Sequence, residues 1–292
     1  MGQHAQKGEQ NVVVAMTARI DAHVHVWSGD EAAYPFSPHD GLAAPKEIFD
    51  ADRLVAAMDP AGVSQALAIQ PRVYGYDHAY LFAASASLGQ RLRIVPLLNA
   101  VRSSNVDEMQ AFLGRDDLAG FRVIALGSER ADWLNGPQAT RLWRSLAEAG
   151  LPLGLLITAI QLPVVEILAE REPSLPIVVD HLGGIGADDW PEYGPVLLGL
   201  SCLPRVHVKL SAFGHLSRDC YPYEDLRKPV RQLLDSFGPA RLLWGSDWPH
   251  VYEFGSYQDS ADSAADAIGI EHPAERELIF GGTARALYGF GT

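Results

Sequence analysis

Polar and apolar residues alternate near the start of this chain. The stretch from Ile20 to Val26 reads IDAHVHV. Because side chains of a β-strand point alternately to its two faces, Asp21, His23 and His25 are predicted to share one face. Placing three polar groups side by side in a protein interior is costly unless they are paired or bind something. The pattern therefore predicts that this face belongs to an active site.

Two later apolar runs also end in residues that can do chemistry. One run ends at His181, which two glycines follow closely, and another ends around Asp247 beside Trp248. Aspartate is uncommon inside strands. With an ordinary pKa of about 3.9, Asp247 would be ionised at pH 7 and could take a proton from water. Imidazoles can donate hydrogen bonds to a carbonyl oxygen as negative charge develops there. These groups together predict the attack of water on an ester or lactone carbonyl.

Eight short apolar runs recur along the chain, with helical patterns between them. Each interval is long enough for one crossover helix and too short for more. The succession predicts a single (β/α)8 TIM barrel, in which the C-terminal ends of the strands carry the active site. A doubly wound open sheet is the alternative, but no G-x-G-x-x-G follows the first run. The runs span residues 20–26, 63–70, 92–99, 120–126, 151–157, 176–182, 206–212 and 242–248.

The segments between these runs have helical spacing and recognisable ends. Asp50 is predicted to cap a helix that ends near Pro60, and Gly150 is predicted to end another. A last helix is expected over residues 274–287. Residues 1–18 are interpreted as a polar leader outside the fold, and residues 19–292 as one domain.

Composition excludes several classes of protein. The 292 residues include 23 Lys and Arg against 36 Asp and Glu, a net charge of −13 with no basic cluster. Binding to nucleic acid or to an anionic membrane is therefore not expected. No apolar run reaches the roughly 18–20 residues of a membrane span. Cys202 and Cys220 cannot form a disulfide framework or a CxxC pair. A cytoplasmic protein is expected, and its oligomeric state stays open.

A second set of residues is predicted to bind the substrate. Arg122 faces away from its apolar neighbours on the fourth run, so its guanidinium is expected inside the barrel. There it could grip a substrate carboxylate with two hydrogen bonds, or form a salt bridge to a nearby acid. Lys209 on the seventh run faces the same way. The remaining candidates lie near the mouth of the barrel and are Arg72, Tyr74 and His250. The set predicts a small anionic substrate.

Several strings resemble the amidohydrolase superfamily. They are IDAHVHVW, IVVDHLGG and LLWGSDWPH, which occur in this order on the first, sixth and eighth runs. Weaker strings, including AIQPRVYGYD, GFRVIAL and VKLSA, resemble the amidohydrolase-2 branch, which includes lactonases of the 2-pyrone-4,6-dicarboxylate and fuconolactone types. The resemblance covers about residues 19 to 289. It implies a barrel hydrolase, most simply a lactonase.

The chain departs from this family at the strands that supply a further metal ligand in metal-dependent members. Arg122 lies on the fourth run, and Thr158 stands where a ligand would be expected after the fifth. We therefore expect no metal. The alternative is one divalent ion, zinc or manganese, held by His23, His25, His181 and Asp247. The terminal motif reads Gly281-Gly282-Thr283 where the family usually has Gly-Asn.

The sequence thus predicts a lactone hydrolase that acts on a carboxylate-bearing lactone, with Asp247, His23, His25 and His181 as its catalytic residues. One alternative is a metal-dependent hydrolase or decarboxylase of an aromatic or muconate-type acid. The other is a barrel that only binds a ligand, for which a base beside three imidazoles would bring no advantage. The sequence does not identify which lactone or ester is the substrate.

Overall fold

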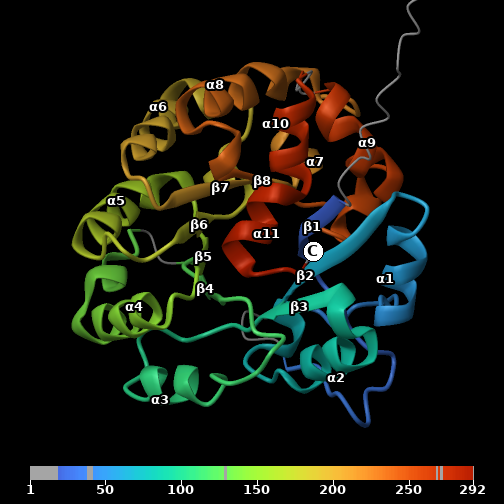
Figure 1. The fold of residues 1–292 in the computed structure, drawn as a ribbon, viewed down its shortest axis with the longest axis vertical. Coiled ribbons are helices and arrows are strands. Elements are labelled where there is room, and N and C mark those ends of the chain that lie inside the picture. The colour runs from blue at the N-terminus through green and yellow to red at the C-terminus, as the bar shows by residue number, and fades with distance from the viewer. Residues whose placement is uncertain (1–18, 38–41, 128–129, 268, 270–271, 292) are drawn as a thin grey trace, which may run out of the picture.

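A computed structural model describes residues 19–37, 42–127, 130–267, 269 and 272–291 of the chain. The predicted leader, residues 1–18, lies outside the described residues. Each of the eight predicted runs overlaps one strand, β1 beginning one residue before its run, and the strands form the ring seen in Figure 1. They are β1 (Arg19–Val24), β2 (Val63–Ile69), β3 (Leu92–Val95), β4 (Phe121–Ile124), β5 (Leu153–Leu156), β6 (Ile177–Val179), β7 (Val206–Leu210) and β8 (Leu242–Trp244).

The strands are parallel and close into a barrel. Two regular sheets, β1-β2-β3 and β4-β5-β6-β7-β8, are joined at both seams by backbone hydrogen bonds beyond the regular strands. At one seam Leu98 N donates to Arg122 O at 2.9 Å, and at the other Asp247 N donates to His23 O at 3.0 Å. The predicted TIM barrel is confirmed, and the open sheet is wrong.

Helices surround the ring of strands (Figure 1). Asp50 caps α1 as predicted, because its side chain accepts a hydrogen bond from Arg53 N, and Gly150 ends α4 at a φ of 69°. Such a positive φ favours glycine. The helices are α1 (Ala51–Met58), α2 (Ala79–Leu88), α3 (Asn105–Gln110), α4 (Pro137–Ala149), α5 (Leu162–Arg171), α6 (Trp190–Gly199), α7 (Phe213–Leu216), α8 (Arg227–Phe237), α9 (Tyr257–Ala267), α10 (Pro273–Glu277) and α11 (Thr283–Tyr288).

The C-terminal segment is not the single helix that its pattern predicts. A π-helical turn at Leu278–Gly282 separates α10 from α11, and Gly281 inside it leaves helical geometry. Two consecutive glycines are poor helix formers, which explains the break. Figure 1 shows α11 across the middle of the ring. Its Ala284 and Tyr288 pack against barrel residues such as Leu67 and Leu243, so this end of the barrel is closed.

The side chains of the first strand do not alternate as its sequence predicts. Asp21 and Val24 are three positions apart on β1 but pair with Ala66 and Ala68, which are two positions apart on β2. The β1 side therefore carries one extra residue, as in a β-bulge. Ile20 and Ala22 therefore pack in the interior of the barrel. Asp21 does not share a face with the two histidines, and its carboxylate accepts a hydrogen bond from Tyr257 of α9. The expectation that Asp21 lines the site is wrong.

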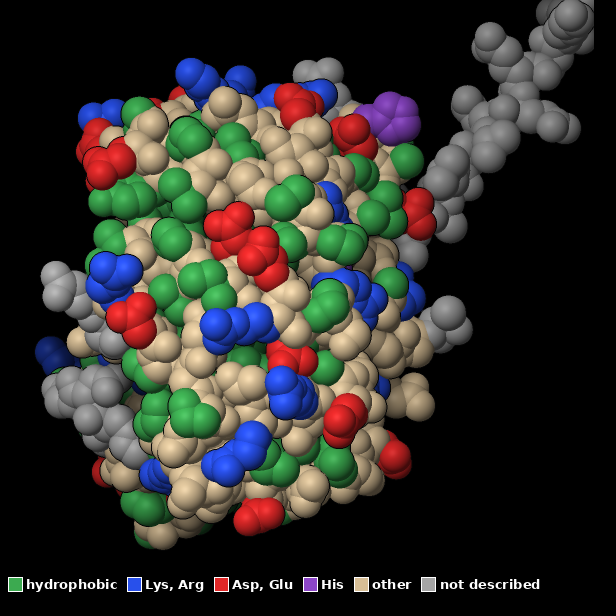
Figure 2. Space-filling view, turned by 90° about the vertical axis from the view of Figure 1, so that its left-hand side faces the viewer, with side chains coloured by type: hydrophobic (Ala, Val, Ile, Leu, Met, Phe, Trp, Pro, Cys, Tyr) green, Lys and Arg blue, Asp and Glu red, His purple; other side chains and the backbone are tan. Residues whose placement is uncertain are grey.

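The outer surface shows no concentration of one charge on the face in Figure 2, where acidic and basic side chains are interspersed. Within the described part of the chain, no helix has both the length and the apolar character needed to cross a membrane.

Candidate active site

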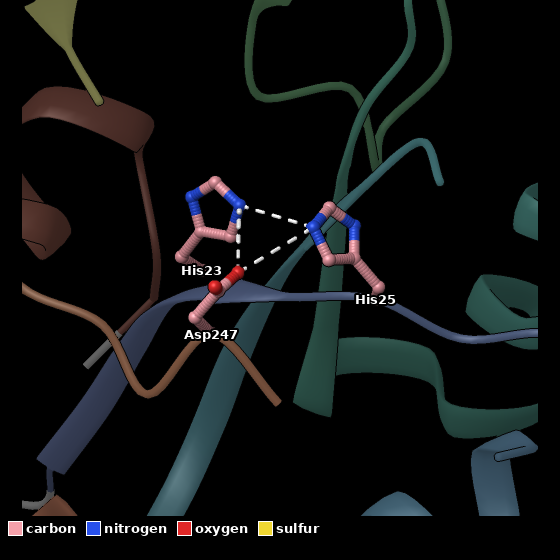
Figure 3. A group of neighbouring side chains, drawn as sticks. All are labelled: His23, His25 and Asp247. Atoms are coloured by element: carbon pink, nitrogen blue, oxygen red, sulfur yellow. Dashed lines mark hydrogen bonds and ion pairs between the residues drawn. The ribbon is translucent and has the colours of Figure 1, made fainter. Parts of the chain in front are cut away.

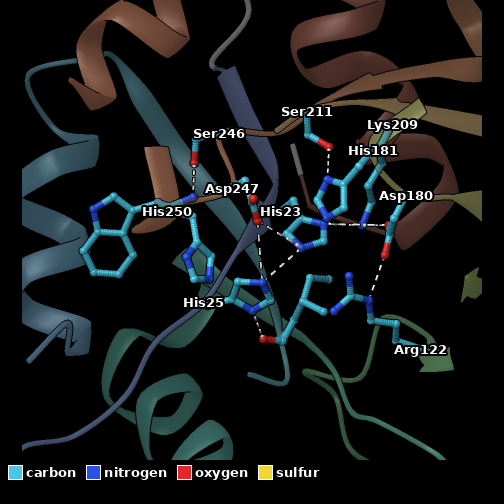
Figure 4. A network of polar contacts seen from close by, with 12 residues as sticks. His23, His25, Arg122, Asp180, His181, Lys209, Ser211, Ser246, Asp247 and His250 are labelled. Carbon is cyan, nitrogen blue, oxygen red and sulfur yellow. Dashed lines mark hydrogen bonds and ion pairs between the residues drawn. The ribbon is translucent and has the colours of Figure 1, made fainter. Parts of the chain in front are cut away.

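A cavity of about 640 Å³ opens at the C-terminal ends of the strands. Its lining includes three of the predicted catalytic residues, His25, His181 and Asp247. Three of the predicted substrate-binding residues, Arg72, Arg122 and His250, also line it. His23 and Lys209 are fully or almost fully buried in the network that adjoins its floor (Figure 4).

Tyr74 is the predicted site residue that belongs neither to the lining of this cavity nor to the buried network beside its floor. It is buried in a short 3-10 turn, and its ring stacks on Phe36. Its hydroxyl accepts a hydrogen bond from Ser28 N at 2.9 Å. Burial raises the pKa of Tyr74 to about 12. The expectation that Tyr74 binds substrate at the mouth is wrong, because the turn after β2 directs the side chain into packing.

His23, His25 and Asp247 meet at one point (Figure 3). Nε2 of His23 lies 3.2 Å from Nε2 of His25, and Oδ1 of Asp247 lies 3.6 Å from each of them. Nδ1 of His25 is 2.9 Å from Ile69 O, so this nitrogen carries a proton and donates it. Neutral His25 therefore has its lone pair on Nε2, where it accepts from the Nε2–H of His23.

A buried cluster of charges supports this group (Figure 4). Lys209 Nζ lies 3.2 Å from Nδ1 of His23 and 3.1 Å from Oδ1 of Asp180. Arg122 Nε donates to Oδ2 of the same Asp180 at 2.7 Å. The salt-bridge alternative for Arg122 is thus present in the structure, and the guanidinium nevertheless lines the cavity. The ammonium of Lys209 donates to Nδ1 of His23, which leaves the proton of that ring on Nε2.

His181 is oriented by Ser211, just after β7. Nδ1 of His181 lies 2.8 Å from Ser211 Oγ. When the hydroxyl donates to Nδ1, the proton of the neutral ring is on Nε2, the nitrogen left for the cavity. His181 and Asp247 both have positive φ values, 51° and 60°. Such backbone is strained in residues other than glycine and is typical of functional sites.

Burial sets the protonation of these groups. It lowers the pKa of His181 to about 3 and holds the pKa values of His23 and His25 well below the usual range. Burial alone would raise the pKa of Asp180, but the charges of Lys209 and Arg122 hold it at about 2. At neutral pH the three imidazoles are therefore neutral, and Asp180 is a carboxylate.

Asp247 differs from the expectation drawn from its ordinary pKa. Burial raises the pKa of Asp247 to about 8, against which the opposite charge of Arg122 acts only partly. The carboxyl is therefore mostly protonated at pH 7 in this structure, and the predicted ionised state at that pH is wrong. A base with a pKa near the working pH is well matched to proton transfer.

His23, His25 and Asp247 could together hold a metal ion. Nε2 of His23, Nε2 of His25 and Oδ1 of Asp247 are separated by 3.2, 3.6 and 3.6 Å. A circle through three atoms at these separations has a radius of about 2.0 Å, close to zinc–nitrogen and zinc–oxygen bond lengths. His181 groups instead with His23 and Asp180, where the ammonium of Lys209 repels a cation.

Sequence reasoning missed two residues that hold the site together, Asp180 and Ser211. Asp180 precedes His181 directly, and the rarity of aspartate in strands, which drew attention to Asp247, would have found it. Asp21, which the sequence predicted to line the site, supports it from behind instead, because its Oδ1 accepts from the backbone nitrogens of His23 and Ser246 at 3.0 and 2.9 Å. Asp21 thereby ties the strand of the histidines to the residue before Asp247.

Comparison with known proteins identifies the family of the chain. The family model described as "Amidohydrolase" matches residues 20–290. An L-fucono-1,5-lactonase of Burkholderia ambifaria is 27% identical over 291 residues, which cover 94% of this chain and 96% of the relative. A 4-sulfomuconolactone hydrolase of Hydrogenophaga intermedia is 27% identical over 236 residues, 79% of this chain and 74% of the relative. A solved amidohydrolase of Burkholderia multivorans with bound zinc superimposes with a TM-score of 0.81 at 25% identity, covering 94% of this chain and all of that one.

Proposed function

Because the chain belongs to the amidohydrolase family, we propose that it is a lactonase that opens a small anionic lactone by attack of water on the carbonyl. The observation that carries the proposal is the position of Asp247, a buried carboxyl 3.6 Å from the imidazoles of His23 and His25 at the floor of a substrate-sized cavity. The relatives named as fuconolactone and sulfomuconolactone hydrolases support the choice of a lactone.

Asp247 is the proposed general base. In its ionised form it takes a proton from a water molecule while the water oxygen bonds to the lactone carbonyl carbon. The carbon–oxygen bond of the ring then breaks, and the protonated Asp247 returns the proton to the departing alkoxide oxygen. The product is an open-chain hydroxy acid, whose carboxylic acid group then ionises by releasing its proton to solvent. A positioned base of this kind contributes about 10²–10⁴-fold to the rate.

His181 and Arg122 are the proposed stabilisers of the developing oxyanion. Both line the cavity with Asp247. When the Ser211 hydroxyl donates to Nδ1 of His181, the Nε2–H of that ring is available to the cavity, and Asp180 holds Arg122 through its Nε. Preorganised donors of this kind contribute about 2.7–4 kcal/mol each in the transition state.

A carboxylate on the substrate is proposed to bind through Arg122 as well. The net charge of −13 repels anions from the protein as a whole. A local positive group inside the cavity must therefore outweigh that repulsion. Lys209 is proposed to act indirectly, because its ammonium is engaged by His23 and Asp180.

Catalysis is proposed not to require a metal ion. His23, His25 and Asp247 would hold a divalent ion, and a bound ion would polarise the carbonyl and acidify water. The zinc in the Burkholderia multivorans structure is a reason to consider it. Against it, Lys209 donates to Nδ1 of His23, so Nε2 of that ring carries a proton that it must lose before binding an ion.

The experiment is an assay of purified protein against lactones that differ in size and charge. Opening of carboxylated lactones is expected. Decarboxylation of an aromatic or muconate-type acid, with no lactone opened, would favour the alternative enzyme. Binding of these compounds without any turnover would identify the barrel as a binding protein.

A further inference from the structure

We propose that the outer part of the cavity is a subsite for a planar apolar group, so that the substrate is a lactone with an aryl-type substituent. The proposal rests on the lactone hydrolysis proposed above. The subsite is the aromatic wall formed by Trp27, Phe49 and Tyr252, all of which line the cavity. Neither the names of the relatives nor the catalytic group specifies such a substituent.

The wall is a continuous series of rings that starts at the catalytic group. The centroids of His25 and His250 are 5.7 Å apart, and those of His250 and Trp27 are 6.2 Å apart. Trp27 lies 5.4 Å from Phe49, which lies 5.9 Å from Tyr252. A substituent attached to a lactone bound beside His25 would therefore meet aromatic faces and edges on its way to the mouth.

The cavity is larger than the lactone head requires. A six-membered lactone with one carboxylate has about ten non-hydrogen atoms, each smaller than the roughly 30 Å³ that a water molecule occupies in the liquid. Such a molecule fills less than half of the 640 Å³. Apolar side chains at the outer end remain exposed, with 37% of Leu42 and 42% of Tyr252 accessible. An apolar substituent would cover them and would gain the free energy of that burial.

The chemistry of the wall favours an apolar group over a polyhydroxylated one. Each sugar hydroxyl placed against it would need a hydrogen-bond partner. The indole Nε1 of Trp27 already donates to Glu47 O at 2.7 Å. Apolar residues complete much of the lining, including Val73 and Leu156. The charged side chains of Lys46 and Glu47 are exposed at the mouth, where they face solvent.

The test compares two carboxylated lactones with the same ring, one unsubstituted and one with a phenyl group. The ratio of their kcat/KM values is measured for the wild-type protein and for Tyr252→Ala. The expected ratio favours the phenyl lactone by about 10-fold or more in the wild-type protein. This ratio should fall by about 3- to 10-fold in Tyr252→Ala, which corresponds to the free energy of one lost aromatic–aromatic contact.

Tyr221→Ala is the matched control, because Tyr221 has a similar exposed fraction of 45% and lies outside the cavity lining. Its ratio should equal that of the wild-type protein. A cyclohexyl lactone tests planarity and should be preferred less than the phenyl lactone. A ratio near one in the wild-type protein, a ratio unchanged by Tyr252→Ala, or preference for a polyhydroxylated lactone would overturn the proposal.

Binding separates this proposal from the proposed reaction. Calorimetry with the two ring-opened hydroxy acids gives the same preference as a ratio of dissociation constants, without turnover. Phenyl-selective binding in a protein that opens no lactone would refute lactone hydrolysis and support the subsite. Lactone opening without phenyl selectivity in either measurement would refute the subsite and leave the reaction in place.

Discussion

Lys209 Nζ lies 3.2 Å from Nδ1 of His23, and both side chains are almost completely buried inside the barrel. The ammonium can only donate, so Nδ1 accepts and the ring carries its proton on Nε2. That proton points to Nε2 of His25, whose own Nδ1–H donates to Ile69 O. The ammonium on β7 thus fixes the tautomer of His23 on β1, and the Ile69 carbonyl fixes that of His25 just after this strand.

Replacement of the proposed base should remove most of the activity. Asp247→Asn keeps the shape of the side chain but cannot take a proton from water, so kcat should fall at least about 10²-fold. Steady-state kinetics and circular dichroism should show a slow but folded enzyme. Asp52→Asn, at an exposed carboxylate on α1, is the matched control and should retain full activity. Near-normal kcat in Asp247→Asn would exclude Asp247 as the base.

Activity should rise as pH increases through about 8. The raised pKa of Asp247 means that only about a tenth of the protein has an ionised base at pH 7. Below the pKa of this carboxyl, kcat/KM should increase about tenfold per pH unit, and above it the value should level off. The pKa values of His23, His25 and His181 are lowered, so these rings stay neutral over this range. A plateau from about pH 6 upward would contradict this assignment.

Loss of the Ser211 hydroxyl should slow the chemical step more than it weakens binding. In Ser211→Ala, His181 no longer has a donor to fix its proton on Nε2, so kcat should fall about tenfold, the effect of one net hydrogen bond. KM should change little. Ser211→Thr restores the hydroxyl and should recover most of kcat. Equal losses in the alanine and threonine variants would indicate a packing role for Ser211.

Removal of metal should leave the activity intact. Ion binding at Nε2 of His23 would require loss of the proton that Lys209 places there. Dialysis against a chelator, followed by elemental analysis and assay, is expected to give a metal-poor and fully active protein. Stoichiometric zinc or manganese, together with activity that disappears on chelation and returns with the ion, would show that the group binds a catalytic metal.

Substitution of Arg122 should penalise a substrate with a carboxylate more than a neutral one, because loss of the oxyanion contact affects both. A charge-assisted hydrogen bond to the carboxylate contributes about 1.5–3 kcal/mol, so the fall in kcat/KM in Arg122→Met should be roughly 10- to 200-fold greater on the carboxylated substrate. Arg122→Lys keeps the charge without the planar fork and should lose nearly as much. The comparison is a carboxylated lactone against its neutral methyl ester. Equal losses on both would assign Arg122 to the oxyanion or to its ion pair with Asp180.

The sequence by itself determined the barrel and the place of the site within it. Apolar runs at regular intervals require parallel strands with crossover helices. Each of these elements is specified by the residues of its own short segment. The polar residues at the ends of three runs then had to lie at the open end of the barrel. Strand alternation also placed Arg122 and Lys209 in the interior, where the structure has them.

Only the tertiary structure decided the state of those residues. The extra residue in β1, which moved Asp21 away from the site, shows itself only in the pairing with β2. The ion pairs of Asp180 join β4 and β7 to the end of β6. The pKa of Asp247 and the tautomer of His23 depend on burial and on partners far away in the chain. Electrostatic interactions act through space in a medium of low dielectric constant, so they are fixed only when distant strands are brought together.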